Sequence, residues 1–210
     1  MPDEDDIQVE AVNGLPERPP AGEHILWQGR PATWALARDS LAMYWVAGYF
    51  ALLAVWRVGV SSVDMGFAGA LPLAIPFLIL GLIACGLILF VSWMQARATV
   101  YTITTARVAM RVGAALTVTL NLPFRRIASA DLELRRDGTG TIALTTLGET
   151  RLSYLVLWPH VRPWRMKQTQ PALRSVPDAE RVARILAEAA ETRVSEPQIA
   201  ARAPSPMAAE

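Results

Sequence analysis

The chain has 210 residues, of which 52% are apolar and 19% are charged, and it carries a formal net charge of +1. Soluble domains are typically about 45–50% apolar and about 25% charged, and here the apolar excess lies between residues 41 and 94, which excludes a purely water-soluble chain and indicates a membrane segment joined to a soluble domain. The single cysteine, Cys85, excludes an intrachain disulfide and a cysteine-based metal or haem site.

The N-terminal region precedes the apolar stretch. Residues 1–22 are acidic and then rich in Pro and Gly, which predicts a disordered tail. A tail of this polarity is not a signal peptide, so the first membrane helix would itself direct targeting. Residues 23–40 are predicted to hold a short strand at 25–31 and a lead-in. That strand has to pair across the membrane segment with strands much later in the chain.

Two uncharged runs predict a transmembrane hairpin, assigned as a unit to residues 41–94. The run 41–56 has sixteen residues, or about 24 Å of helix, which flanking residues can extend toward the roughly 30 Å hydrocarbon core. The run 67–94 has 28 residues, or about 42 Å, enough to cross once but not twice. Pro72 and Pro76 predict a kink or an irregular start to this second helix.

The distribution of Arg predicts the orientation of the hairpin. Only Arg57 lies near the connection between the two runs, whereas several Arg flank their other ends. Basic residues near membrane spans favour the cytoplasmic side. We therefore expect a multi-pass protein of the bacterial inner (intracytoplasmic) membrane, with both termini in the cytoplasm.

Residues 95–191 are predicted to form a basic cytoplasmic domain. Between positions 95 and 176 there are twelve Lys or Arg and four Asp or Glu. Apolar and polar residues alternate at 108–112, 116–122 and 131–135, and a turn lies at 137–140. This pattern predicts about six short antiparallel strands that curl into a sandwich or barrel.

A C-terminal amphipathic helix is expected to cap this β domain. Ser175 and Asp178 fit a capping box. An apolar stripe follows at helical spacing and has to be buried against the strands; it consists of Val182, Ile185, Leu186 and Ala189. Residues 192–210 are predicted to be a second disordered tail.

Two motifs that flank the apolar stretch carry a family resemblance. Residues 22–31 read Gly-Glu-x-Ile-Leu-Trp-x-Gly-x-Pro, and residues 101–107 read Tyr-x-Ile-Thr-x-x-Arg. This combination resembles bacterial membrane proteins with a pleckstrin-homology-like (PH-like) domain. The resemblance implies a PH-like β barrel or sandwich capped by a C-terminal helix.

A sharper resemblance involves residues 157–165 and 170–174, together with 15–23 and 49–57. These segments are similar to PuhB, the photosynthetic complex assembly family of purple bacteria. That family is often drawn with three membrane spans, whereas the run lengths here predict two. The resemblance implies a role in building the photosynthetic reaction centre and its core antenna, with subunits of those complexes as partners.

The candidate contact residues are aromatic or basic. One group lies on a Pro-containing segment and is expected to contact a partner or the membrane: Trp158, His160, Arg162, Trp164 and Arg165. The alternative is a strand-to-helix connection with Trp158 packed under it, directly after the apolar strand predicted at 155–157. A second group is expected to contact lipid headgroups: Arg97, Arg125 and Arg126. His160 could bind bacteriochlorophyll, but a surface or turn histidine is the preferred interpretation, and no cofactor or metal is expected.

Motifs that the sequence lacks exclude two further classes of function. It contains no nucleophile with a base, no HExxH and no P-loop, so we expect no enzyme. No nucleic-acid-binding motif accompanies the basic charge. Three hypotheses remain: a photosynthetic assembly factor, a generic membrane-anchored PH-like module that binds a protein, a peptide or itself, and a lipid or pigment carrier.

Overall fold

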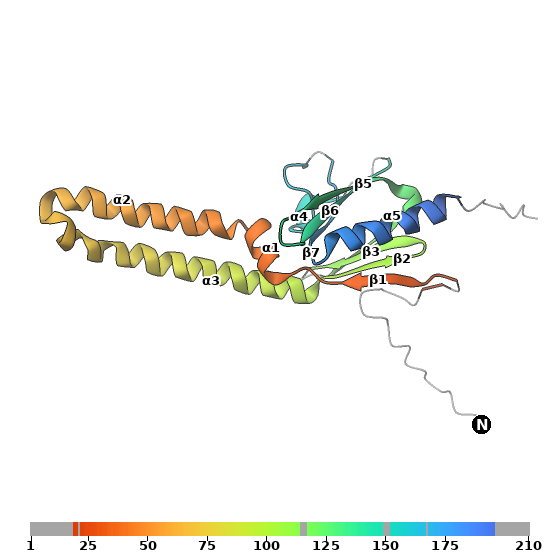
Figure 1. Ribbon diagram of the computed structural model, residues 1–210, viewed down its shortest axis with the longest axis horizontal. Coiled ribbons are helices and arrows are strands. Elements are labelled where there is room, and N and C mark those ends of the chain that lie inside the picture. The colour runs from red at the N-terminus through yellow and green to blue at the C-terminus, as the bar shows by residue number, and fades with distance from the viewer. Residues whose placement is uncertain (1–18, 21, 114–116, 149–151, 167, 196–210) are drawn as a thin grey trace, which may run out of the picture.

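The computed structural model describes residues 19–20, 22–113, 117–148, 152–166 and 168–195. Two long helices project from one end of a β domain (Figure 1). The tails predicted at 1–22 and 192–210 lie mostly outside the described residues, as does Leu116 of the predicted alternation, although the last helix continues to Ser195.

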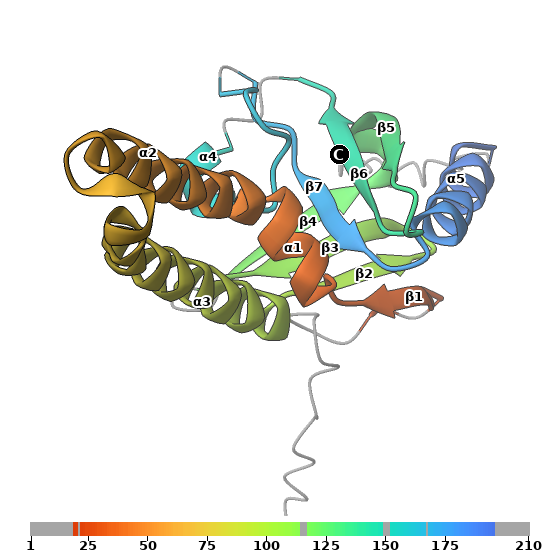
Figure 2. The same ribbon diagram turned by 60° about the vertical axis from the view of Figure 1, so that its left-hand side comes forward.

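Helices α2 (Met43–Ala70) and α3 (Ile75–Ala98) lie side by side and run in opposite directions, joined by the 3-10 helix η1 (Leu71–Ala74) (Figures 1 and 2). Helix α2 continues through the predicted connection 61–66 up to Gly66, which has φ 72° and ψ 161°. Glycine tolerates that positive φ, so the helical path breaks there. The irregular start predicted from the two prolines is confirmed, because η1 precedes α3.

Among the described residues, one helical stretch, Met43–Ala98, is long and apolar enough to cross a membrane. Its 56 residues include α2, η1 and α3, and only 6% of its most apolar window is buried in the molecule. A core helix of a soluble protein would be mostly buried. Because α2, η1 and α3 form one continuous candidate span, two separate membrane crossings remain a prediction.

The first sheet has the order β1 (Ile25–Gly29), β2 (Val100–Thr104), β3 (Arg107–Val112) and β4 (Val118–Pro123), and all its pairs are antiparallel. Trp27 of β1 pairs with Ile103 of β2. This pairing confirms that the N-terminal strand reaches across the helical segment to the later sheet, and it places both ends of the helical pair at the same domain.

The second sheet has the order β5 (Ile127–Leu134), β6 (Gly140–Thr146) and β7 (Ala172–Val176), also antiparallel. The 3-10 helix η2 (Phe124–Arg126) connects β4 to β5. Strand β7 was not predicted. The expected alternation fails on β5, where Leu132 and Leu134 remain 39% and 49% exposed, because Leu132 lines an open groove and Leu134 a surface depression instead of the packed core.

Three helices complete the domain. Helix α1 (Thr33–Asp39) replaces the predicted lead-in. Helix α4 (Tyr154–Leu157) replaces the apolar strand predicted at 155–157; only Leu157 is buried there, so the apolar run is not a core strand. Helix α5 (Ala179–Ser195) is the predicted cap. The capping-box prediction is wrong, because Ser175 belongs to β7 with φ 52° and lies outside the helix.

The two sheets and α5 enclose one core, and the predicted stripe of α5 faces it. Val182, Leu186 and Ala189 are buried, and Ile185 is partly buried. Burying a Val, Leu or Ile side chain contributes on the order of 2 kcal/mol. The core also contains Tyr101, Ile103, Val108, Met110, Val112, Leu122, Phe124, Ile142, Leu144, Leu157, Val161, Leu173, Val176 and Ala179.

Candidate functional site

The structure separates the predicted contact residues into buried, paired and exposed side chains. His160 is fully buried, and Arg162 is partly buried and bonded to Asp131. Trp158 is 44% exposed and Trp164 is 89% exposed, and Arg165 is also exposed. The predicted group is therefore not one surface.

His160 is buried, which corrects the expectation of a surface histidine, although it does lie in a turn, where its main-chain N–H donates to the Leu157 carbonyl. Its Nδ1 lies 2.6 Å from Tyr101 Oη, and its Nε2 lies 3.1 Å from Thr99 Oγ1. The main-chain N–H of Arg174 also donates to Tyr101 Oη. With Tyr101 donating to Nδ1 and Nε2–H donating to Thr99, both ring nitrogens and the Tyr101 hydroxyl have hydrogen-bond partners. Both ring nitrogens are thus engaged by protein oxygens, so neither is available for a pigment magnesium.

Burial keeps this histidine neutral. Desolvation, followed by repulsion from Arg174, lowers the pKa of His160 to about 3. Desolvation also raises the pKa of the Tyr101 hydroxyl above its ordinary value. Neither group exchanges a proton near neutral pH, so the pair acts as a structural connection rather than as an acid or base.

Arg174 extends the same network to α1. Its Nη1 donates to the Val161 carbonyl at 3.3 Å, and its Nη2 donates to the Asp39 carbonyl at 3.2 Å. Its Nε is buried without a hydrogen-bond partner among the described residues. Desolvation accordingly lowers the pKa of this guanidinium. The buried network joins β7, α1 and the residues that directly follow α3.

A charge cluster fastens α1 to the β5–β6 turn. The buried Asp39 carboxylate pairs with Arg38 and Arg135, each at 2.8 Å, and Arg38 also pairs with Asp137 at 2.8 Å. Hydrogen bonds from Thr139, and then from Arg38, lower the pKa of Asp137 to about 2. Because α1 lies only a few residues before α2, the cluster sets how the helical pair leaves the domain.

The two recurrent motifs meet in space. Glu23, from the first motif, accepts hydrogen bonds from Arg107 Nε at 2.9 Å and from Thr104 Oγ1 at 2.7 Å, both in the second motif. The Glu23 side chain is 8% exposed, so this pair is well shielded from water. These motif residues therefore hold β1 against β2 and β3, and they are structural rather than binding residues.

The predicted headgroup residues lie in two different places. Arg97 is exposed in the last turn of α3, over the ring of Trp93 at 5.2 Å. Arg125 and Arg126 are exposed on η2, which contacts α5, and α5 ends away from the helical pair (Figure 1). Only the position of Arg97 favours contact with the membrane that α2 and α3 would enter.

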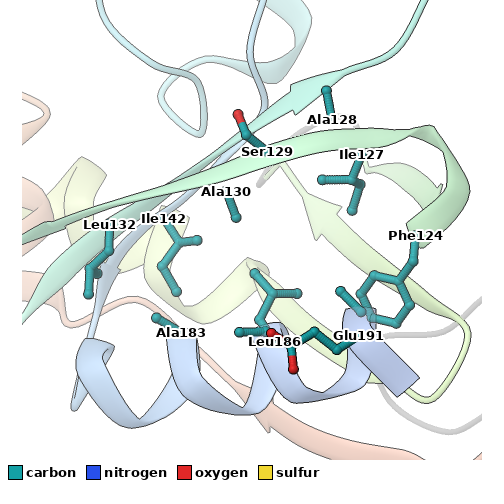
Figure 3. Close-up of a pocket in the computed structure, with 12 residues that line it drawn as sticks. Phe124, Ile127, Ala128, Ser129, Ala130, Leu132, Ile142, Ala183, Leu186 and Glu191 are labelled. Atoms are coloured by element: carbon teal, nitrogen blue, oxygen red, sulfur yellow. The ribbon is translucent and has the colours of Figure 1, made fainter. Parts of the chain in front are cut away.

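An apolar groove lies between β5 and α5. It has a volume of about 560 Å³. Leu132, Ile142 and Leu186 point into the space between strand and helix, and Phe124 and Glu191 lie toward one end (Figure 3). Among the described strands, β5 pairs only with β6, so its other edge is open beside the groove. The sequence pattern did not reveal the groove, which forms only when α5 packs beside β5.

Comparisons with known proteins agree with this architecture. The family described as "Bacterial PH domain" matches residues 42–190. A protein of Rhodobacter capsulatus, described as an uncharacterized 23.7 kDa protein in the puhA 5′ region, is 48% identical over 198 residues, which are 93% of this chain and 92% of that protein. No solved structure matches the chain.

Proposed function

Because the chain belongs to the bacterial PH domain family, we propose that it is a membrane-anchored, non-catalytic assembly factor for the bacterial photosynthetic reaction centre and its core light-harvesting complex. The PH-like domain is a non-catalytic interaction fold. The function proposed for it is to hold subunits or immature intermediates of these complexes while they assemble.

The proposed role in photosynthetic assembly rests on the similarity to the protein from Rhodobacter capsulatus. Its description places it in the 5′ region of puhA, and that gene name shares its prefix with PuhB. The resemblance of residues 157–165 and 170–174 to PuhB points in the same direction. The high identity over nearly the whole of both chains supports the same role for both proteins.

The membrane anchor is proposed to be the helical pair, crossing the bilayer twice. A straight helix of 56 residues would be about 84 Å long, far more than the roughly 30 Å hydrocarbon core. The break at Gly66 instead allows each of α2 and α3 to match one crossing. Their outward side chains include Trp45 and Val63, which are 83% and 85% exposed, and such apolar surface is costly in water.

The groove between β5 and α5 is the proposed docking site for a partner subunit. Its apolar lining suits apolar side chains, and the open edge of β5 can pair with an extended backbone. We therefore expect the occupant to be an extended apolar segment on the cytoplasmic side of a reaction-centre or core-antenna subunit.

A deletion strain of a phototrophic host tests this function. We expect reduced core-complex absorbance during phototrophic growth, restored by the wild-type gene. Ala187→Arg places a charged side chain in the groove from an exposed position of α5, so it should fail to restore absorbance at normal protein abundance. Glu180→Arg adds the same side chain to α5 outside the groove and should restore it. Normal core-complex absorbance in the deletion strain would contradict the proposal.

The alternative is a generic membrane-anchored PH-like module that serves envelope stress or secretion, or that associates with itself. The family match by itself is compatible with it. The two functions differ in expression, since an assembly factor should accumulate under phototrophic conditions and a generic module should not depend on them. Affinity capture from cells that are assembling reaction centres should recover core subunits only under the first.

A further inference from the structure

A second apolar surface lies outside the helical pair, on α4 and the segment that follows it up to Met166. Leu155 is 83% exposed, Val156 is 55% exposed, Trp164 is 89% exposed and Met166 is 65% exposed. Large apolar side chains exposed this far, and this close together in the chain, indicate contact with an apolar environment. Residues 154–166 are called the α4 segment below.

The buried network holds the α4 segment at the base of the helical pair. His160 is bonded to Thr99, the residue that directly follows α3, and to Tyr101. Arg174 bonds the Val161 carbonyl and the carbonyl of Asp39, which lies shortly before α2. Both views show α4 at the end of the β domain from which α2 and α3 leave (Figures 1 and 2).

We propose that the α4 segment is a third membrane contact, seated in the lipid–water interface beside the helical pair. The inference rests on the proposed membrane insertion of α2 and α3. The apolar residues of the α4 segment would then reach the boundary between headgroups and acyl chains. Trp158 and Trp164 have the amphipathic rings that are enriched at headgroup depth, and Arg165 can pair with lipid phosphate.

Continuity with the apolar helices favours lipid over a protein partner. The α4 segment lies at the end of the domain from which the helical pair projects. A bilayer that α2 and α3 cross would therefore contact the segment as well. His160 and Leu157 are buried and anchor its inner side, while its outer side chains are free to enter the interface. Contacts by two helices and by this segment together would set the tilt of the β domain, and with it the direction that the groove faces.

Depth-dependent quenching in the full-length protein tests the proposal. Cys85 is the single cysteine, so Cys85→Ser gives a background for single labels. Leu155→Cys and Trp164→Cys are labelled with a polarity-sensitive fluorophore in phosphatidylcholine–phosphatidylglycerol nanodiscs. Leu82→Cys, at a 76% exposed site on α3, reports insertion of the helical pair, and Glu188→Cys, exposed on α5, is the matched label expected to stay in water.

We expect blue-shifted emission and loss of fluorescence with shallow nitroxide lipids at positions 155 and 164, loss with deep nitroxide lipids at 82, and no loss at 188. Quenching at 82 with no lipid quenching at 155 and 164 overturns this inference and leaves the anchor intact. Absence of quenching at 82 instead overturns the membrane anchor itself. Protection of 155 and 164 from aqueous iodide only when core-complex subunits are added would assign the surface to a protein partner and reject the lipid contact.

Discussion

At the residue scale, side chains far apart in the sequence are joined by short polar contacts at the two ends of β2. Glu23 bonds Thr104 and Arg107, and His160 bonds Thr99 and Tyr101. A buried polar group without a partner costs about 1–3 kcal/mol. Each of these residues is therefore constrained by its partner, which explains why the motif residues that carry the family resemblance are structural.

The depressed pKa of His160 predicts a pH dependence of stability. The unfolded chain binds a proton near the ordinary histidine pKa of 6.5, whereas the folded chain does so only near pH 3. The unfolded state therefore holds more protons between these values, and stability falls as the pH decreases from 6.5 toward 3, by at most about 1.4 kcal/mol per pH unit. The melting temperature of the full chain in detergent should drop between about pH 7 and 5, and His160→Gln should reduce that drop. An equal drop in both proteins would contradict this account.

At the scale of elements, α5 is amphipathic and closes the core. Leu186→Asp places a carboxylate among buried apolar side chains, at a cost on the order of several kcal/mol. We expect loss of the folded β domain, seen as rapid proteolysis of residues 95–195. Ala187→Asp, one position away on an exposed site, should leave protease resistance unchanged, and equal resistance of both variants would show that α5 is not buried as described.

The packing of α2 against α3 depends on Gly81. A Cβ added at this glycine would lie 2.8 Å from Phe50 Cβ, which is too close for two non-bonded carbon atoms. Neither atom is at the flexible end of a side chain, so neither can easily move away. Gly81→Ala should therefore push the helices apart and lower the melting temperature in detergent. Gly86→Ala is the matched control in the same helix, because a Cβ added there would meet no atom within 4 Å. Equal melting temperatures for the two variants would exclude close packing at Gly81.

At the scale of the whole molecule, the helical pair and the β domain are tied together from both sides. The chain enters through β1 and α1 and returns through α3 into β2, and β1 pairs with β2. Ser92 of α3 also donates to the carbonyl of Thr33 in α1 at 2.6 Å. Both ends of the helical pair therefore meet the same domain, which is consistent with placement of that domain on one side of a membrane.

Reporter fusions test this topology. The excess of Arg at the domain end of the helices predicts a cytoplasmic domain and an external helix connection. A reporter active only in the periplasm should be active when fused after Met65 and inactive when fused after Glu191. The reverse pattern would contradict the orientation, and inactivity at both sites would contradict a double crossing.

The sequence by itself determined the apolar helical stretch, most strands of the β domain and the buried stripe of α5. Each of these follows from a local pattern, since hydropathy and periodicity are properties of a segment and of the side chains within it. The sequence did not determine β7, the helical state of residues 154–157 or the burial of His160. The burial of His160 depends on contacts with Thr99 and Tyr101, and β7 forms by pairing with β6; these partners are remote in the chain and come together only when the domain folds. The groove beside β5 likewise exists only because α5 packs against an edge strand, so tertiary structure decided where the proposed docking site lies.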